Sequence, residues 1–594
     1  MQRWTWLTLT RALNSESYFE QGKIRGRTGT TLDHVGFSFP DLGARMTIYQ
    51  VKFQTMYKTL IVTGLLVVLS GSQFASAENV GGIDRQDKTI TLTLFQEPRS
   101  LNSLTAESVS YTAQLMVHVQ EGLMRYDHRR KLTGGVAERW QETPGELRFW
   151  LRSEATWQDG NPVKAGDFVY AWQQLVSPDT ASPSANLASP IKNASRILKG
   201  EMPISDLGVV AINDKELLVI LEHPCAWCLK LMTNSIFYPV NQDFYEKQGE
   251  SYGTSAASHL SNGAFKIKQW QRGKNIHLTK NERYWGSGRV YLNNIRFDYI
   301  GSDAKTILNL FRAGEIAVAN LDRDTIPEAL EQGFRLRTYP SGHLFNIQFS
   351  HVAGMLSANE NLRKAISLVI DKQELVNRVV ASPGTRIADS MFHDWLTIGN
   401  VTYAKERPPV PHKVDLEKAK QHLQLAENEL SLNGEIELTL TINDSDLYRR
   451  IAEYMQQRLS THLGIRVNID PQITQMMVEK WRTGTSDMTL ITWPVDVDDP
   501  MDQISFMGNP DFRAVFQGLY KGDDMAALYV RNKNAIETEE RIDAVNAVHE
   551  LFNNRVTVLP LFESYGVSTI NPSLKGFIWQ PVRGYADFRY VKIR

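Results

Sequence analysis

Four aspartates follow Trp493 at close spacing: Asp496, Asp498, Asp499 and Asp502. Clustered carboxylates can bind calcium, but this segment lacks the EF-hand spacing with its central glycine and distal glutamate. A carboxylate can also bind an ammonium group, and that bond is stronger in a closed, low-dielectric cleft than in water. A solvated acidic loop is the simpler interpretation of the same residues.

The two cysteines of the chain form one short motif, Cys225-Ala226-Trp227-Cys228. A thioredoxin-like site would need its own βαβ unit, c-type haem attachment would need His where Leu229 stands, and zinc would need two more ligands. We therefore expect either two small buried side chains or a local disulfide.

Motifs of common enzymes are missing from the sequence. There is no Gly-x-Ser-x-Gly elbow and no phosphate-binding glycine-rich loop, and His549-Glu550 lacks the second histidine of a zinc protease. These observations predict a protein that is not an enzyme and that uses no cofactor and no metal.

Composition restricts the partners further. Lys plus Arg (65) nearly equal Asp plus Glu (66), so no basic excess would attract nucleic acid. The chain has 594 residues, of which 42% are hydrophobic. Because this length exceeds what one hydrophobic core usually organises, more than one lobe is expected. The 13 Trp and 21 Tyr offer rigid, amphipathic contact area for a ligand.

The elements that position these residues alternate between strands and helices. In 89–95 (TITLTLF) apolar and polar side chains alternate, which predicts a half-buried strand. Further strands are predicted at 217–221, 276–278, 436–442 and 465–469. Helical stretches separate them, so the pattern indicates an α/β fold without internal repeats.

Two helices are well marked in the second half. Residues 416–430 carry apolar side chains near helical spacing, and 447–463 follow a capping Ser445 or Asp446 and end at Gly464. The resulting strand-helix-strand unit places the loop 443–448 at the carboxyl end of a strand, where open α/β sheets usually bind ligands.

Residues 46–77 are typical of a secretory signal. Lys52 and Lys58 accompany the apolar run 60–69, and a small-residue cleavage site at 75–77 would leave Glu78 as the new N-terminus. The apolar run is far shorter than the roughly 20 residues that cross a bilayer.

Ser72 stands where a lipoprotein would carry its cysteine. The sequence thus predicts a soluble periplasmic protein with a cleaved signal, not a lipoprotein. Residues 1–45 precede the signal, and we expect them to be disordered or to reflect a mis-assigned start, with Met46 or Met56 as the true first residue.

Seven short motifs follow one another between about residue 88 and the C-terminus: 156–163 (TWQDGNPV), 167–172, 177–183, 262–265 (NGAF), 281–285, 362–365 and 370–372. In these motifs the chain resembles the periplasmic oligopeptide- and dipeptide-binding proteins of bacterial ABC transporters, family 5 of the extracytoplasmic solute-binding proteins. Most of the matching residues, Trp172 and Trp285 among them, are interpreted as scaffold, with Asp159-Gly160 in a tight turn.

The resemblance implies a two-lobed α/β fold of the periplasmic-binding-protein type (class II) with a small inserted domain. Carried over, lobe I comprises 86–119, 242–340 and 564–594, the inserted domain 120–241, and lobe II 341–563. It also implies the function: a monomer captures a short peptide between closing lobes and delivers it to an inner-membrane ABC permease.

The resemblance also assigns the ligand contacts. The family places an Asp three residues beyond a Trp to bind the ammonium of the peptide, so Asp496 becomes the anchor and Trp493 an aromatic wall. An extended peptide would pair its main chain with the edges of the site as an added strand. By position, the remaining contacts are Glu107, Val109, Ser184 (where a Tyr is usual), Asn443 and Tyr448. Each of these can equally be a surface loop residue.

Departures from the family pattern leave the ligand open. Leu490 stands where relatives that bind tri- to pentapeptides have Arg, Thr474 replaces a Trp, and Arg482 lies one position from another expected Arg. No cysteines match the bridge of some relatives near Ser341 and Pro494. The alternatives are a murein or antimicrobial peptide, haem or a nickel chelate in the same fold, a chaperone function and, from another class, a secreted hydrolase.

Overall fold

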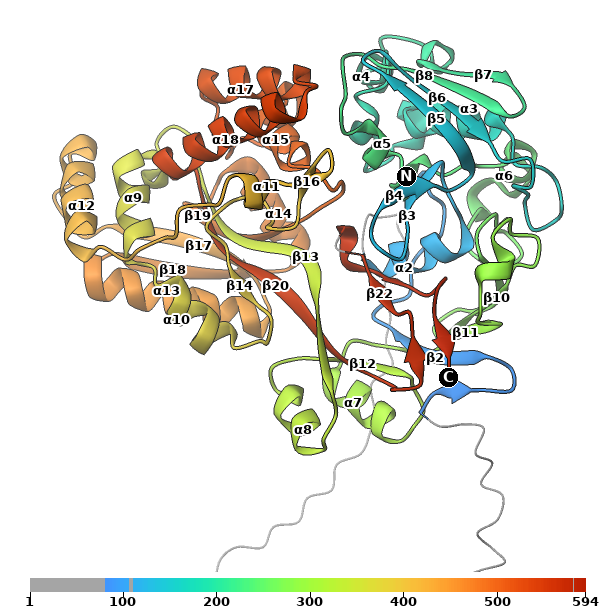
Figure 1. Cartoon of the computed structure of the whole chain (residues 1–594). Helices are drawn as coiled ribbons and strands as arrows, with labels where there is room; N and C mark the ends of the chain where they lie inside the picture. Colours follow the sequence, from blue (N-terminus) through green and yellow to red (C-terminus); the bar gives the residue numbers. More distant parts are fainter. Residues whose placement is uncertain (1–80, 106–109, 581) are drawn as a thin grey trace, which may run out of the picture. The chain divides into compact units, whose positions relative to one another are not determined.

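Three sheets of four or more strands organise the residues that the structure describes, 81–105, 110–580 and 582–594 (Figure 1). The structure is a computed structural model, and these residues belong to one unit, Ser76–Arg594. Helices and sheets are mixed, which confirms the predicted α/β class. The predicted signal at 46–77 and the segment 1–45 lie outside the described residues.

The first sheet has five strands in the order β1-β2-β11-β10-β9. Its members are β1 (Ile83–Asp84), β2 (Thr89–Leu94), β9 (Phe265–Gln271), β10 (Asn275–Lys280) and β11 (Asn294–Ile300). Ile90, Leu92 and Leu94 are buried as their alternation predicted. Strand β2 runs parallel to β11 and helix α2 (Ser110–Val119) contacts β9, so segments distant in sequence share one core.

The second sheet has four antiparallel strands in the order β5-β6-β8-β7. They are β5 (Ala137–Thr143), β6 (Glu146–Leu151), β7 (Val209–Asn213) and β8 (Glu216–Ile220), and helix α3 (Ala165–Leu175) contacts β7. Gly160 adopts a φ of +98°, as the predicted turn requires. Trp157 and Trp172 are fully buried in the core, so these motif residues are scaffold.

The third sheet follows the order β12-β20-β13-β19-β17-β18, with β14 paired to β20. Its members are β12 (Val318–Leu321), β13 (Leu336–Phe349), β14 (Arg386–Ile387), β17 (Glu437–Asn443), β18 (Arg466–Gln472), β19 (Met488–Pro494) and β20 (Val558–Ile570). The long antiparallel pair β13 and β20 extends from β19 at one end to β12 at the other (Figure 1).

Local sequence signals locate two helices accurately. Helix α12 (Leu416–Leu430) has the predicted bounds, and α13 (Asp446–Leu463) begins after Ser445. Gly464 ends α13 with a φ of +66°, a left-handed conformation that glycine adopts without strain. Strands β17 and β18 flank α13 and pair in parallel, as the strand-helix-strand prediction requires.

Helices near β19 come from the last third of the chain: α14 (Thr474–Thr483), α15 (Met501–Gly508), α16 (Pro510–Val515), α17 (Asp523–Asn534) and α18 (Thr538–Arg555). The other α-helices are α4 (Ala194–Leu198), α5 (Cys228–Leu231), α6 (Gln242–Gln248), α7 (Ala304–Arg312), α8 (Thr325–Glu331), α9 (Glu360–Val369), α10 (Lys372–Glu374) and α11 (Tyr403–Glu406). Two-stranded pairs are β3/β4 (Met124–Tyr126, Leu132–Gly134), β15/β16 (Thr397–Ile398, Val401–Thr402), β21/β24 (Leu574–Lys575, Lys592–Ile593) and β22/β23 (Ile578–Trp579, Ala586–Asp587). Within the described ranges, no helix has the length and apolar character needed to span a bilayer.

Two further family motifs have a packing explanation. A Cβ on Gly263 would lie 2.7 Å from backbone atoms of residues 118–120, so only glycine fits there. The buried guanidinium of Arg363 donates to the carbonyls of Ser357, Ala358, Arg555 and Val556, which ties α9 to the end of α18. These motifs therefore report the fold and not a ligand site.

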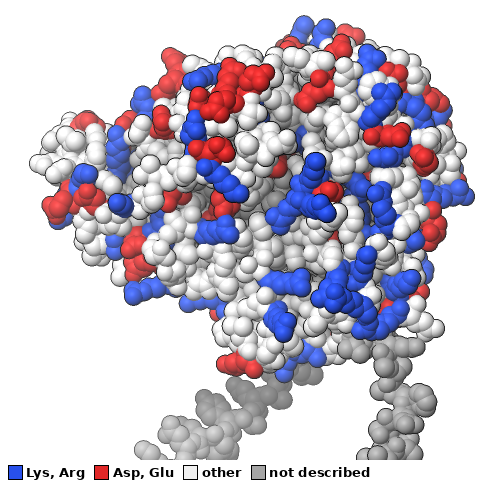
Figure 2. Space-filling model, viewed as in Figure 1, with Lys and Arg blue, Asp and Glu red and all other residues white. Residues whose placement is uncertain are grey.

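Charged side chains of both signs are interspersed over the upper part of the visible face (Figure 2). Lys and Arg gather more densely toward the lower right of that view. The overall balance follows from the nearly equal numbers of basic and acidic residues in the sequence.

Candidate functional site

A pocket of about 400 Å³ lies between two parts of the chain that are distant in sequence. Residues from 183–190 and 223–231 line one side, and residues from 478–529 line the other. Pockets of this size commonly hold small ligands. Three of the predicted site residues, Ser184, Trp493 and Asp496, are among its lining residues.

Strand β19 and the turn after it supply the best-defined wall. Trp493 pairs with Leu344 of β13, and its side chain is buried against Phe506, with ring centroids 5.6 Å apart. The aromatic part of the prediction for Trp493 is thus compatible with its position. Its indole Nε1 is buried and has no hydrogen-bond partner among the described residues.

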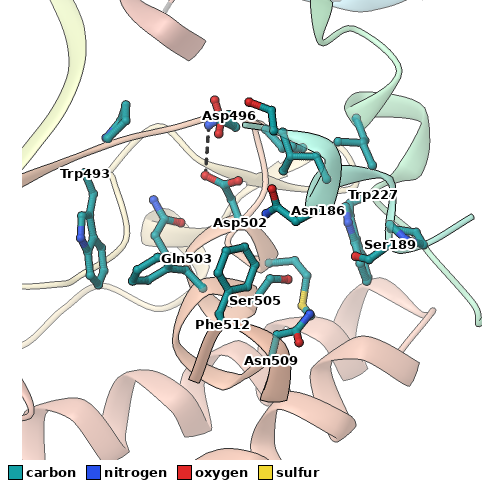
Figure 3. A pocket seen from close by; sticks show the side chains of 18 of the residues that line it. Asn186, Ser189, Trp227, Trp493, Asp496, Asp502, Gln503, Ser505, Asn509 and Phe512 are labelled. Carbon is teal, nitrogen blue, oxygen red and sulfur yellow. Dashed lines mark hydrogen bonds between the residues drawn. The ribbon is translucent and has the colours of Figure 1, made fainter. Parts of the chain in front are cut away.

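Asp496 lies half-buried at the edge of the pocket. Its backbone N–H donates to Oδ2 of Asp502 at 3.1 Å, a contact drawn in Figure 3. Asp502 occupies the first turn of α15, where a negative charge is favoured by the helix dipole. Asp496 and Asp502 therefore both line this end of the pocket.

The other two aspartates of the cluster face away from the pocket into a buried network. Asp499 is fully buried and pairs with Arg541 at 2.5 Å. Asp498 accepts hydrogen bonds from the backbone N–H and hydroxyl of Thr397, each at 3.0 Å. Burial raises the pKa of Asp498 to about 6, although the nearby Lys230 ammonium opposes that shift.

Lys230 connects this network to the opposite wall. Its ammonium donates to the carbonyl and hydroxyl oxygens of Thr397 and to the carbonyl oxygen of Asp498, at 2.6 to 2.7 Å. Lys230 lies in α5, which begins at Cys228. The hydrogen bond from the Lys230 ammonium to the carbonyl of Asp498 thus helps to fix the turn that carries Asp496.

Trp227 forms the wall opposite Trp493 (Figure 3). It lies between Cys225 and Cys228, which form a disulfide, the second of the two alternatives that the sequence left open. The guanidinium of Arg541 stands 5.8 Å from the centre of the Trp227 ring. The disulfide and the cation–π contact together restrict the position of this indole.

Two of the other predicted residues, Asn443 and Tyr448, do not line the pocket. Asn443 donates to the hydroxyl of Thr474 at 3.0 Å, and Tyr448 packs against Phe345, with burial raising its pKa. Neither is among the described lining residues. Glu107 and Val109 lie outside the described residues.

The structure also shows where the three residues that differ from the family pattern lie. Leu490 is fully buried in the core of the third sheet, and Thr474 opens α14. Arg482 pairs with Glu479 at 2.5 Å and is not among the described lining residues of the pocket. In the described part of the chain, no group of three or more His, Cys, Asp or Glu could hold a metal ion.

Sequence reasoning missed most of the aromatic lining. Trp227, Trp481, Phe506, Phe512 and Tyr529 come from separate helices and loops and share no periodic pattern. Only Trp227 had a visible signal, because it lies inside the cysteine motif. Gln503 was missed as well, since a single glutamine in a helix carries no local signature.

Comparisons with known proteins agree over most of the chain. Residues 131–512 match the model of the bacterial extracellular solute-binding proteins, family 5 Middle. The chain is 27% identical to the periplasmic oligopeptide-binding protein OppA of Salmonella typhimurium, over 88% of this chain and 95% of that protein. It is 26% identical to the dipeptide-binding protein DppE of Bacillus subtilis, over 84% and 90% respectively. The structure of Listeria monocytogenes OppA bound to peptide superposes with a TM-score of 0.71 at 25% identity, covering 85% of this chain and 99% of that one.

Proposed function

Because the chain belongs to the bacterial extracellular solute-binding proteins of family 5, we propose that it captures short peptides and delivers them to an inner-membrane ABC permease. The observation that carries the proposal is the position of Asp496 at the edge of a pocket whose lining includes six aromatic side chains. There its carboxylate can bind the ammonium group that every unmodified peptide carries. The peptide-binding names of the relatives support the same ligand class.

Capture of the peptide requires the two lobes to close on it and involves no covalent reaction. The ligand bridges the two sides of the pocket and favours the closed arrangement through its higher affinity for it. We propose the boundaries given by the family: lobe I at 86–119, 242–340 and 564–594, an insert at 120–241, and lobe II at 341–563. Strands β13 and β20 cross the boundaries between the lobes, so they are suited to act as the hinge.

The finer features of the proposal come from the sequence. We propose a monomeric periplasmic protein, without enzymatic activity or lipid anchor, released by cleavage after residue 77. N-terminal sequencing of the protein recovered from a bacterial periplasm would find Glu78 first. A mature protein that retained residues 46–77 would contradict cleavage.

The ammonium contact is tested by titration calorimetry on the ligand-free protein. Replacing Asp496 with Ala should weaken binding of a tripeptide by about 2 to 5 kcal/mol, as when one partner of a partly buried charge pair is removed. Asp243→Ala, an exposed aspartate in α6 that is not among the described lining residues, is the matched control and should leave binding unchanged.

An N-acetylated form of the same peptide completes the experiment. Acetylation removes the positive charge, so it should weaken binding to the wild type about as much as Asp496→Ala does. Combining both changes should add little, because each removes the same contact. Additive losses, or an unchanged affinity of Asp496→Ala, would show that Asp496 does not bind the ammonium.

A further inference from the structure

Gln503 lines the pocket with a side-chain amide that no described residue satisfies. The residue lies in α15 and is 3% exposed, yet neither its Nε2 nor its Oε1 has a hydrogen-bond partner among the described residues. Leaving a buried amide unpaired is costly, and such groups are rare in folded proteins. A ligand that completes these bonds would explain why the site contains this residue.

The surroundings of Gln503 indicate what that ligand contains. Gln503 lies between Trp493 and Asp502 (Figure 3), and the buried indole N–H of Trp493 also has no hydrogen-bond partner in the part of the chain that the structure describes. A side-chain amide offers both a donor and an acceptor, which complements the C=O and N–H of a peptide group. Hydrogen-bonding groups for a main-chain amide thus stand next to the carboxylates of Asp496 and Asp502.

The rest of the pocket is suited to a large apolar side chain. Six aromatic side chains line it: Trp227, Trp481, Trp493, Phe506, Phe512 and Tyr529. Among the described lining residues none is Lys or Arg, and burial lowers the pKa of His223, so that histidine is neutral at pH 7. The pocket therefore favours a cationic end combined with apolar bulk, and it offers no positive partner to a carboxylate.

We propose that this pocket takes the first residue of a peptide with a bulky apolar side chain, and that Gln503 binds the peptide group that follows. The inference rests on the proposed function, and it adds a ligand preference and a binding residue. The ammonium lies at Asp496, the side chain enters the aromatic part, and Gln503 with the Trp493 indole bonds the main chain.

The preference is tested with two tripeptides, Phe-Ala-Ala and Ala-Ala-Ala, titrated into ligand-free protein. Burying the phenyl ring should tighten binding about 10- to 100-fold. Phe512→Ala, at a half-buried position of the aromatic wall, should weaken Phe-Ala-Ala more than Ala-Ala-Ala and so reduce the ratio of their affinities. Equal affinity of the wild type for both peptides would refute the preference.

Gln503→Leu tests the main-chain contact. Its affinity for both peptides should fall about 10-fold with their ratio preserved. The melting temperature of the ligand-free variant should stay the same or rise, because two unpaired polar atoms are replaced by apolar ones. A structural glutamine would behave in the opposite way.

Gln348→Leu is the matched control, since Gln348 is equally buried but donates to Asn346 at 2.8 Å. It should lower the melting temperature. Unchanged affinity of Gln503→Leu, or a melting temperature lowered as in Gln348→Leu, would refute the role of Gln503. If neither peptide binds the wild type, the proposed function fails as well. If both bind through Asp496 but equally well, only the preference fails.

Discussion

Replacing Lys230 with methionine removes the ammonium that bonds to Thr397 and Asp498, and it keeps most of the apolar part of the side chain. The ammonium makes three hydrogen bonds of 2.6 to 2.7 Å and lies 3.9 Å from Oδ2 of Asp499, and its side chain is 11% exposed. Removing one partner from a buried charge network of this kind costs about 3 to 5 kcal/mol. We expect a loss of that size in the free energy of unfolding at pH 8.

The cost should depend on pH through Asp498. Folding raises the pKa of this carboxyl from 3.8 to about 6 through burial. Between these two pH values the carboxyl is protonated in the folded state and ionised in the unfolded state, so the stability of the wild type falls as the pH rises. Lys230 is the charge that limits this rise. Each further unit of pKa increase in the variant adds about 1.4 kcal/mol to the cost at pH 8 and none at pH 5, where Asp498 is protonated.

Chemical denaturation at pH 5 and pH 8, followed by tryptophan fluorescence and circular dichroism, measures both effects. Lys199→Met is the matched control, because Lys199 pairs with Asp511 at 2.9 Å on the surface, where the two side chains are 52% and 54% exposed. Exposed pairs of this kind contribute little to stability. The reasoning is refuted if Lys230→Met costs no more than the control, or if its cost is the same at both pH values.

Further predictions concern the scaffold. Gly263→Ala should lower the free energy of unfolding by about 1 to 3 kcal/mol, because its Cβ would meet backbone atoms at 2.7 Å. Gly166→Ala in α3, where nothing lies within 4 Å, should instead raise it by about 0.4 to 1 kcal/mol, and equal effects of the two changes would contradict the packing argument. Removing the disulfide by Cys225→Ala with Cys228→Ala should cost about 2 kcal/mol, the loop entropy of so short a ring, as measured by denaturation. Dithiothreitol should cause a similar loss in the wild type and none in the double variant, and a double variant as stable as the wild type would show that the disulfide contributes nothing.

Local elements could be predicted from the sequence because their signals lie within a few residues of one another. The bounds of α12, the end of α13 at Gly464 and the alternation in β2 each depend on short-range backbone and solvation preferences. The turn at Gly160 in the motif 156–163 is of the same kind, because it depends on the backbone preference of a glycine. The fold itself was implied by the resemblance of this and the other motifs to a family. Trp493 and Asp496 could be proposed because the resemblance to the family carries the roles of its Trp and Asp over to these two positions.

The composition of the pocket was decided only by the tertiary structure. Trp227 and Gln503 are separated by hundreds of residues, and nothing in either segment specifies that they line the same pocket. The aspartates after Trp493 show the same limit. They look equivalent in sequence, but Asp499 is neutralised by the distant Arg541, whereas Asp496 lies at the pocket edge. Burial and long-range pairing depend on how the chain packs, so residue type and spacing cannot distinguish such side chains.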